Sequence, residues 1–405
     1  MWDPYGIPSW IDCHSSGTTM GIPIDDDTTA LVIDSGSLFT RSGFAGDDAP
    51  RSYISTVVGR HEYNKWMVGM DGKDSYIGTE AQNKRGLLSL SYPTDEGIVK
   101  DWADWAKIME YIFTTELKVS STECPVLMSD PPRNPRSSRE TMTEVMFESF
   151  NVPGFYLAMQ PLLSMYTSGR GTGIMLEVGN SVSHIAAVYE GYAIKEATRR
   201  IPFAGSHVTD SLAAKLNERG HSFCSLSDME DVMKLKDRHS YVADSDNVAA
   251  YEMEHAYSNY YTDYKKRYEL PDGQSISVGD ELFLCNEGLF KPYLFNVDSI
   301  GIHEHVFESL MQCDMDTRRD MLANVIIAGG TTLTSGFSER LRKELEVLCP
   351  KATRVRIVTV PERKMSSWIG GSILASLSSF QSQWISKCEY EEFGPSIIHK
   401  KCHDL

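Results

Sequence analysis

The stretch ALVIDSGSLFTRSGFAG, residues 30–46, decides the fold because its plan recurs later in the chain. It consists of an apolar run that ends in an acid, Asp34, then a glycine two residues further on, a turn with hydroxyl side chains and a second strand-like run. The stretch GIMLEVGNSVSHIAAVYEG, residues 173–191, follows the same plan with Glu177 as its acid. Two such hairpins predict two similarly folded halves that face each other across a cleft, where ligands commonly bind. A duplicated hairpin is also compatible with a purely structural role.

Strand-like and helix-like segments alternate along the rest of the chain. Apolar runs such as ANVIIAGG, residues 323–330, have the pattern of buried strands. Helical spacing occurs in three segments, residues 138–150, 207–219 and 337–348. Ser137 and Glu140 stand at the spacing of a capping box, which predicts the start of the first of these helices. The alternation predicts an α/β fold, and the length suffices for about two or three domains.

Bulk composition excludes several classes of protein. The chain is 41% hydrophobic and 23% charged, as in soluble globular proteins, and no apolar run approaches the ~18 residues of a membrane-spanning helix. Its formal net charge of -17 disfavours direct nucleic-acid binding, which depends on clustered Lys and Arg. The 8 cysteines form no C-x-x-C pair, which predicts reduced thiols, a cytosolic or nuclear compartment and no structural metal. Residues 1–24 lack the features of a secretory signal, and we expect a flexible arm there.

Three loops have the composition of phosphate-binding turns. Glycine exposes backbone N–H groups and hydroxyl side chains add donors, so the turn Ser35-Gly36-Ser37 suits an anion. The second turn follows Glu177, and the third is Gly329-Gly330, which leaves room for a flat base or ribose. Each of them could also be an ordinary turn.

Three polar side chains near these turns are candidates for chemistry. Asp34 and Glu177 end corresponding strands, so both carboxylates could point at one spot and hold Mg²⁺ through its water shell. Alternatively, each acid accepts hydrogen bonds from its turn or from a neighbouring N–H. Gln160 begins an apolar helix-like run, where its amide could orient a water molecule or satisfy a buried backbone group.

Several long motifs resemble those of the actin family. They are SGFAGDDAPR (42–51), VGMDGKDSYIGTEAQNKRG (68–86), YELPDGQ (268–274), AGGTTL (328–333) and PERKMSSWIGGSILASLSSFQSQWISKCEYEEFGPSIIHKKC (361–402). The resemblance runs from about Asp25 to Cys402, with an added arm before it and a few extra residues near 246–262. It implies an actin-like ATPase fold, in which two similar α/β domains, divided into four subdomains, surround a central cleft that holds ATP and Mg²⁺. Residues 25–160 and 361–405 would form the first, outer domain, and residues 161–360 the second, inner domain.

The resemblance also implies roles for individual residues. The predicted catalytic residues are Gln160 and His184, which match residues that arrange the attacking water, and Asp34 and Glu177, which would place the metal ion through water. The predicted nucleotide-binding residues are Gly36, Ser37, Leu38, Arg41, Gly179, Asn180, Gly205, Lys236, Asp237, Gly329, Gly330, Thr331 and Lys364. Hydrolysis in such a site would be in-line attack of water on the γ-phosphate, aided by positioning and by the cation.

Several of these positions depart from the pattern of the family. Leu38 replaces a glycine of the first turn. In the second turn, Glu177 replaces an aspartate, and Asn180 and Ser181 stand where actins have Asp-Gly. Met233 replaces a basic residue near the base. Because side chains replace backbone on the γ-phosphate side, we expect ATP binding with slowed or lost hydrolysis.

For assembly, the resemblance implies head-to-tail filaments of the chain with itself or with ordinary actin, and actin-binding proteins near Tyr166 and Gly169. The loop RHEYNKWMVGM, residues 60–70, is altered, and Glu96 replaces a histidine that many actins methylate. The loop PYLFNVDS, residues 292–299, predicts an exposed apolar interface or, alternatively, a strand end that packs into the core. We expect a cytoplasmic, cytoskeletal location, with the nucleus as a second compartment.

Two other functions remain as hypotheses. One is an actin-related scaffold that does not polymerise and serves as a subunit of a larger cytoskeletal or chromatin complex. The filament loops favour a filament subunit, whereas the altered second turn favours the scaffold. The other is a sugar or metabolite kinase of the same superfamily, which would need a catalytic acid aimed at a second substrate pocket, and the sequence suggests no such acid.

Overall fold

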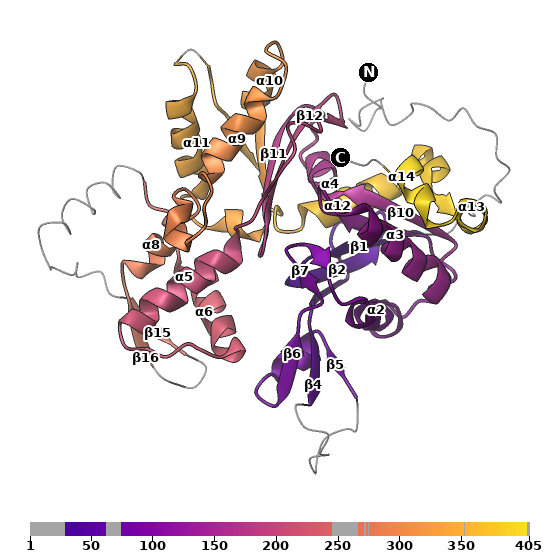
Figure 1. Cartoon of the computed structure of the whole chain (residues 1–405), viewed down its shortest axis with the longest axis horizontal. Helices are drawn as coiled ribbons and strands as arrows, with labels where there is room; N and C mark the ends of the chain where they lie inside the picture. Colours follow the sequence, from indigo (N-terminus) through magenta and orange to yellow (C-terminus); the bar gives the residue numbers. More distant parts are fainter. Residues whose placement is uncertain are drawn as a thin grey trace, which may run out of the picture.

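The structure, a computed structural model, describes residues 29–61, 74–244, 266–270, 273, 275–351 and 353–402. Three features of the sequence lie outside these residues: the arm 1–24, most of the loop 60–70 and the extra residues near 246–262. The described residues form two α/β halves, each with its own central sheet (Figure 1).

The first sheet has six strands within the described residues, in the order β19-β10-β9-β1-β2-β3. They are β1 (Leu31–Ser35), β2 (Phe39–Phe44), β3 (Ser52–Ser55), β9 (Val126–Asp130), β10 (Gly154–Met159) and β19 (Ile385–Ser386). β1 is parallel to β9 and antiparallel to β2. Its apolar run is fully buried, as is typical of a central strand with both faces covered.

The second sheet repeats this arrangement. Its order is β13-β12-β11-β17-β18, with β14 also paired to β12. The strands are β11 (Gly173–Val178), β12 (Ser183–Tyr189), β13 (Tyr192–Ala193), β14 (Arg199–Ile201), β17 (Val325–Ala328) and β18 (Ile357–Thr359). β11 is parallel to β17 and antiparallel to β12, just as β1 is to β9 and β2. The predicted α/β class is therefore confirmed, and the repeated hairpin corresponds to a repeated sheet topology.

Smaller sheets and the helices complete the two halves. The short strands are β4 (Val58–His61), β5 (Tyr76–Ile77), β6 (Leu88–Ser91), β7 (Thr94–Asp95), β8 (Ile98–Val99), β15 (Lys266–Glu269) and β16 (Ser275–Val278). The α-helices are α1 (Thr79–Asn83), α2 (Trp102–Tyr111), α3 (Arg136–Glu144), α4 (Gln160–Thr167), α5 (Gly205–Glu218), α6 (Leu226–His239), α8 (Glu281–Glu287), α9 (Ile302–Met311), α10 (Arg318–Leu322), α11 (Phe337–Leu348), α12 (Ser366–Ala375), α13 (Lys387–Phe393) and α14 (Ile398–Lys401). The other helical segments are η2 (Ile112–Leu117), η3 (Val145–Ser149), η4 (Pro292–Phe295), η5 (Gly330–Leu333), η6 (Ser378–Gln383) and η7 (Pro395–Ile397). No helix in the described part of the chain combines the length and apolarity of a bilayer crossing.

Helices α4 and α12 join the two halves. A Cβ on Gly370 would overlap the carbonyl oxygen of Leu163, so only glycine permits this close helix approach. The hydroxyls of Ser164 and Ser367 share a 3.0 Å hydrogen bond between the same helices. Since α4 also packs on β11 and α12 packs on β1, the helix pair connects the two sheets.

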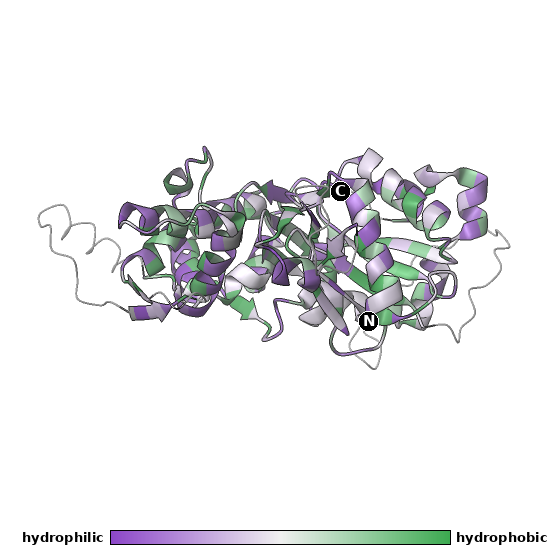
Figure 2. Ribbon diagram, turned by 90° about the horizontal axis from the view of Figure 1, so that it is seen from below, coloured by the Kyte–Doolittle hydropathy of each residue, from purple (hydrophilic) through white to green (hydrophobic). Residues whose placement is uncertain are grey.

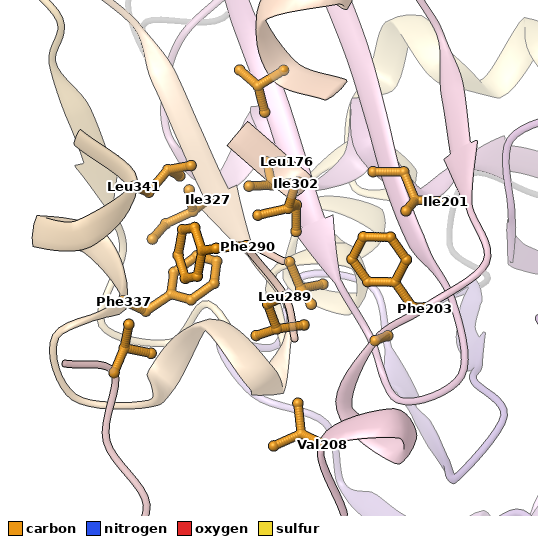
Figure 3. Packing of buried hydrophobic residues seen from close by; sticks show 14 of the residues in the cluster. Leu176, Ile201, Phe203, Val208, Leu289, Phe290, Ile302, Ile327, Phe337 and Leu341 are labelled. Carbon is orange, nitrogen blue, oxygen red and sulfur yellow. The ribbon is translucent and has the colours of Figure 1, made fainter. Parts of the chain in front are cut away.

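Each half has its own hydrophobic core. Figure 3 shows the core of the second half, where Leu176 and Ile327 on the strands lie near Phe290, Phe337 and Leu341. A separate cluster, which includes the buried Trp105 and Trp368, surrounds the first sheet. Figure 2 shows hydrophobic residues on the strands inside each half and hydrophilic residues on outer helix surfaces.

The helix predictions had mixed outcomes. The segment 337–348 coincides with α11, and the segment 207–219 with most of α5. The predicted capping box at Ser137 is wrong, because α3 already begins at Arg136, directly after Pro135. The fixed φ of proline suits the start of a helix, and Ser137 lies inside the first turn without capping it.

Candidate functional site

The first turn joins β1 to β2. The N–H of Gly36 donates a 3.1 Å hydrogen bond to the carbonyl of Phe39, and a Cβ on Gly36 would lie 2.9 Å from that oxygen. Asp34, near the end of β1, is the register partner of Arg41 on β2. The turn therefore requires glycine at position 36. Asp34 and Arg41 lie side by side where the two strands enter and leave the turn.

The second turn, between β11 and β12, has the same geometry. The N–H of Gly179 donates a 3.2 Å hydrogen bond to the carbonyl of Val182, and a Cβ on Gly179 would lie 3.0 Å from that oxygen. Glu177 is the register partner of His184, in the places that the acid and the base occupy in the first hairpin. The repeat therefore extends from sheet topology to individual hydrogen bonds.

The third loop, after β17, packs against the second turn. Gly329 has a φ of +90°, and a Cβ there would overlap the carbonyl of Val178. The hydroxyl of Thr331 donates a 2.7 Å hydrogen bond to the carbonyl of Gly179. Because an L side chain rarely adopts this φ, the loop depends on glycine to reach the second turn.

Lys236 connects α6 to the start of α5. Its Nζ donates 3.0 Å hydrogen bonds to the carbonyl of Gly205 and to Oγ1 of Thr209. Burial lowers the pKa of Lys236, and the negative charge of Asp237 opposes this shift. A Cβ on Gly205 would overlap the hydroxyl of Thr331, so this glycine allows α5 to approach the loop.

These loops and α6 surround a cavity of about 350 Å³. The predicted residues on its wall are Asp34, Gly36, Ser37, Leu38, Arg41, Gln160, Glu177, Gly179, Asn180, His184, Lys236, Asp237, Gly329, Gly330, Thr331 and Lys364. Ser181 and Met233, at two of the departures from the family pattern, also line it. Gly205 does not line the cavity and lies behind its wall, against Thr331 and Lys236.

Part of the wall was not predicted. The residues that sequence reasoning missed are Phe39, Gly97, Val182, Leu333 and Thr334. All except Gly97 belong to the same three loops as predicted residues, so assigning each loop as a whole would have found them. Gly97 lies in the β7–β8 turn, where no sequence signal pointed to this site, and its N–H donates a 3.1 Å hydrogen bond to Oγ of Ser37.

The carboxylate of Asp34 is already paired. Its Oδ2 accepts a 2.7 Å hydrogen bond from Arg41, and its Oδ1 accepts a 2.6 Å bond from the hydroxyl of Ser129. The Gln160 amide lies 3.4 Å from Oδ1 and 3.3 Å from the Ser129 hydroxyl. Asp34 therefore accepts hydrogen bonds from neighbouring side chains, which is closer to the alternative expectation than to direct metal binding.

The carboxylate of Glu177 makes fewer hydrogen bonds than that of Asp34. Its Oε1 accepts a 3.1 Å hydrogen bond from the hydroxyl of Ser367, and its buried Oε2 has no hydrogen-bond partner among the residues that the structure describes. Burial raises the pKa of Glu177 to about 7, with the charge of Asp34 as the second cause, while Ser367 and Arg41 act in the opposite direction. An orphaned carboxylate oxygen on the wall of a polar cavity is a candidate contact for a cation or its water shell.

His184 presents a second orphaned atom to the cavity. Its Nε2 is buried and has no partner among the described residues. Burial lowers the pKa of His184 to about 3, and the positive charge of Arg200 adds to this shift. The ring is therefore neutral at physiological pH and can exchange one hydrogen bond with a ligand or a water molecule at Nε2.

Aromatic rings hold two cations near the cavity. Phe39 and Tyr53 stack with their ring centroids 4.6 Å apart. Nζ of Lys364 lies 5.5 Å and 5.2 Å from these centroids, and the guanidinium of Arg41 lies 5.4 Å from that of Tyr53. Such cation–π contacts favour these positions for the two charges.

A further contact connects the two halves beyond the cavity. Arg85, just after α1, donates hydrogen bonds of 2.8 Å to Glu230 and 3.0 Å to Asp231, both on α6. The three side chains are at most 20% exposed. This ion-pair cluster links the β4–β6 sheet of the first half to a helix of the second half.

The residues present fit a phosphate-bearing ligand with a water-bound cation. Two glycine turns offer backbone donors, and Glu177 offers an unpaired carboxylate oxygen. Among the described residues, no three His, Cys, Asp or Glu side chains converge into a metal site. A cation here would therefore take most of its ligands from water and from the phosphates, as Mg²⁺ commonly does.

The comparison with known families agrees with the repeated fold and the motifs that surround the cavity. The family model described as actin matches residues 25–403, which is nearly the whole chain. The chain therefore belongs to the actin family.

Proposed function

We propose that the cavity binds an adenine nucleotide together with Mg²⁺ and that the chain serves as an actin-like filament subunit. The observation that carries the nucleotide proposal is the pair of equivalent glycine turns that face one cavity, with the Gly329-Gly330 loop beside them. Backbone N–H groups in such turns attract anions, and a Gly-Gly segment lets a base or ribose approach the backbone. Family membership supports the same assignment.

The phosphates would lie in the cavity beside the two turns. Ser37 would donate hydrogen bonds from the first turn and Asn180 from the second, while Gly36 and Gly179, whose N–H groups are bonded within the turns, would leave room for the phosphates. Arg41 would supply positive charge at this end. The base and ribose would lie at the other end of the cavity, near Lys236, Asp237, Gly330, Thr331 and Lys364, with Met233 and Leu333 as an apolar wall.

The cation would lie near Glu177, whose Oε2 has no hydrogen-bond partner within the described ranges. Asp34 would contribute charge through water, since both of its oxygens already accept hydrogen bonds. A bound Mg²⁺ would neutralise negative charge on the phosphate oxygens during hydrolysis.

Gln160 and His184 would position the attacking water. The neutral imidazole of His184 has an Nε2 that no described residue bonds, whereas the Gln160 amide is shared with Asp34 and Ser129. Leu38 and Ser181 place side chains in the cavity where the family has glycine, so we expect slow hydrolysis or none. A phosphate-release assay tests this expectation, and turnover as fast as that of ordinary actin would contradict it.

Calorimetry and thermal unfolding test nucleotide binding. ADP and ATP, each titrated with MgCl₂, should release or absorb heat and raise the melting temperature of the purified chain. Lys364→Met should weaken this binding, because Lys364 lines the cavity, whereas Lys351→Met, at an exposed position off its wall, should not. If neither nucleotide gives heat or a melting shift at saturating concentration, the proposal is wrong.

The filament proposal rests on the family and on one surface loop. In PYLFNVDS, Tyr293 and Leu294 are 65% and 45% exposed. Phe295 and Val297 instead pack against the core, and the Phe295 ring occupies the space that a Cβ on Gly288 would need. The prediction of an exposed patch is therefore correct for Leu294 and wrong for Phe295 and Val297. Two neighbouring exposed apolar side chains still support a partner surface here.

Sedimentation with ATP and Mg²⁺, combined with electron microscopy, tests assembly. Leu294→Glu should reduce the pelleted fraction, whereas Met315→Glu, at an apolar position 82% exposed on another loop, should not. If no filaments form under any nucleotide and ordinary actin filaments do not incorporate the chain, the scaffold function is the better one. The side chains of Leu38 and Ser181 in the cavity favour that second function, because they disfavour turnover.

Three further assignments remain proposals. We infer an outer domain of residues 25–160 and 361–405 and an inner domain of residues 161–360, because the strands of the two central sheets divide between these ranges. Actin-binding proteins near Tyr166 and Gly169 are the proposed partners. A cytoplasmic location, with the nucleus as a second compartment, follows from family membership.

A further inference from the structure

The tips of the two turns are joined by a side-chain hydrogen bond. The hydroxyl of Ser181 donates to Oγ of Ser37 across 2.7 Å, and the N–H of Gly97 donates to the same oxygen across 3.1 Å. A hydroxyl oxygen accepts two hydrogen bonds and donates one. Both acceptor positions of Ser37 are therefore filled, and its own proton remains for one further acceptor.

The bridge occupies the interval between the turns. A separation of 2.7 Å is the contact distance of two hydrogen-bonded oxygens, so no group fits between Ser181 and Ser37 while the bridge exists. In the first turn, Leu38 has the place that Ser181 has in the second, two residues after the glycine. Both side chains line the cavity. Side chains from both hairpins, Leu38 and Ser181, therefore narrow the end of the cavity where the phosphates would lie.

Positive charge at this end is also limited. The guanidinium of Arg41, which lines this end, is paired with Asp34 at 2.7 Å. An additional phosphate would bring negative charge toward the carboxylates of Asp34 and Glu177, which also line the cavity. Both the limited space and the negative charge of these side chains therefore disfavour an additional phosphate.

We propose that Ser181 makes this site selective for a nucleoside diphosphate over the triphosphate, because its bridge to Ser37 closes the space that a third phosphate would enter. This inference rests on the proposed nucleotide function. A diphosphate can accept the remaining proton of Ser37 while the bridge stays closed. A triphosphate must break the bridge or shift the two turns apart.

Calorimetric titration of the full chain with ADP and with ATP, both with Mg²⁺, tests the proposal. The wild-type chain should bind ADP about tenfold more tightly than ATP, a difference of the size expected for one lost hydrogen bond with some steric strain. Ser181→Gly should remove most of this difference by tightening ATP binding, with ADP affinity nearly unchanged. Ser181→Ala, which loses the hydroxyl and keeps Cβ, should change the ratio in the same direction. Ser222→Ala, at an exposed serine off the cavity wall, should keep the wild-type ratio.

The outcomes separate this inference from the function on which it rests. Equal affinities in the wild-type chain, or a ratio that neither Ser181 variant changes, would overturn the selectivity and leave the nucleotide site in place. Failure of the wild-type chain to bind either nucleotide would overturn both. Melting temperatures without nucleotide show whether each variant folds, and Ser181→Ala decides the question if Ser181→Gly does not fold.

Discussion

The hydroxyl of Ser367 on α12 donates a 3.1 Å hydrogen bond to Oε1 of Glu177 at the end of β11. A helix that packs on the first sheet thus holds an acid of the second sheet. The other carboxylate oxygen of Glu177 is buried and has no partner in the described part of the chain, and burial raises the pKa of Glu177 from 4.5 to about 7. The protonation state of Glu177 therefore changes near neutral pH.

Replacement of this acid should change the pH dependence of stability. Because the folded-state pKa of Glu177 is raised, its contribution to stability falls as the pH rises from about 4.5 to about 7 and is constant above that range. Glu177→Gln cannot ionise and should stabilise the chain above pH 7 by up to about 3 kcal/mol, with a smaller gain at lower pH. Melting temperatures from about pH 5 to 8, in chelator and without nucleotide, measure the effect.

The comparison between the two proteins isolates Glu177. His184, whose lowered pKa of about 3 makes stability fall as the pH drops below 6.5, is present in both. A Glu177→Gln variant that melts below the wild-type chain at pH 8 would contradict the raised pKa.

The buried pair of Arg41 and Asp34 should matter more than an exposed pair. Their side chains are 13% and 5% exposed, so Arg41→Ala leaves a buried carboxylate without its cation and should lower the free energy of unfolding by about 3 kcal/mol. In the matched control, Arg342→Ala breaks a pair with Glu346 whose side chains are 44% and 43% exposed, and about 0.5 kcal/mol should be lost. Urea unfolding measures both, and equal losses would show that the Asp34 pair is not important for stability.

Two adjacent glycines should differ sharply in their tolerance of alanine. Gly329→Ala meets both a φ of +90° and the carbonyl of Val178, and should destabilise the chain by about 3 kcal/mol or more. At Gly330, the nearest atom to a new Cβ is on the Lys364 side chain at 3.7 Å, so Gly330→Ala should cost about 1 kcal/mol or less. Melting temperatures of the two variants provide the test. Similar values for both would mean that the third loop does not need its left-handed glycine.

The ion-pair cluster of Arg85 should hold the two halves together beyond the cavity. Arg85→Ala removes the contacts to Glu230 and Asp231 and should speed amide hydrogen exchange both in α6 and in residues 76–91. Lys234 lies 3.4 Å and 3.6 Å from the same acids but belongs to α6 itself. Lys234→Ala should therefore leave exchange in residues 76–91 unchanged, and faster exchange there in both variants would contradict a link between the halves.

Much of the fold could be predicted because its signals are local. The buried runs of β1 and β11 are continuous apolar segments, and each turn after them has its glycine two residues beyond the acid. α11 follows from the spacing of Leu341 and Leu345, which are both buried. The start of α3 was predicted wrongly because Pro135 competed with Ser137 for the first turn.

The site was predicted less completely than the fold. Residues of the three loops were identified because turn chemistry and the family motifs mark them. Gly97 was missed because it reaches the cavity from a short hairpin without a phosphate-loop pattern. Leu294 and Phe295 are neighbours in one loop, yet one is exposed and the other packs on the core, which periodicity does not distinguish.

The sequence by itself determined the α/β class, the duplicated hairpin and membership of the actin family, since these depend on patterns along the chain. Only the tertiary structure decided which groups meet: Ser181 with Ser37, Asp34 with Ser129, and Glu177 with Ser367. Hydrogen bonds and pKa values depend on distance and burial, and these are set by residues far apart in the sequence. The hydrogen bonds and pKa values of the residues that line the cavity therefore depend on the folded chain and cannot be read from its motifs.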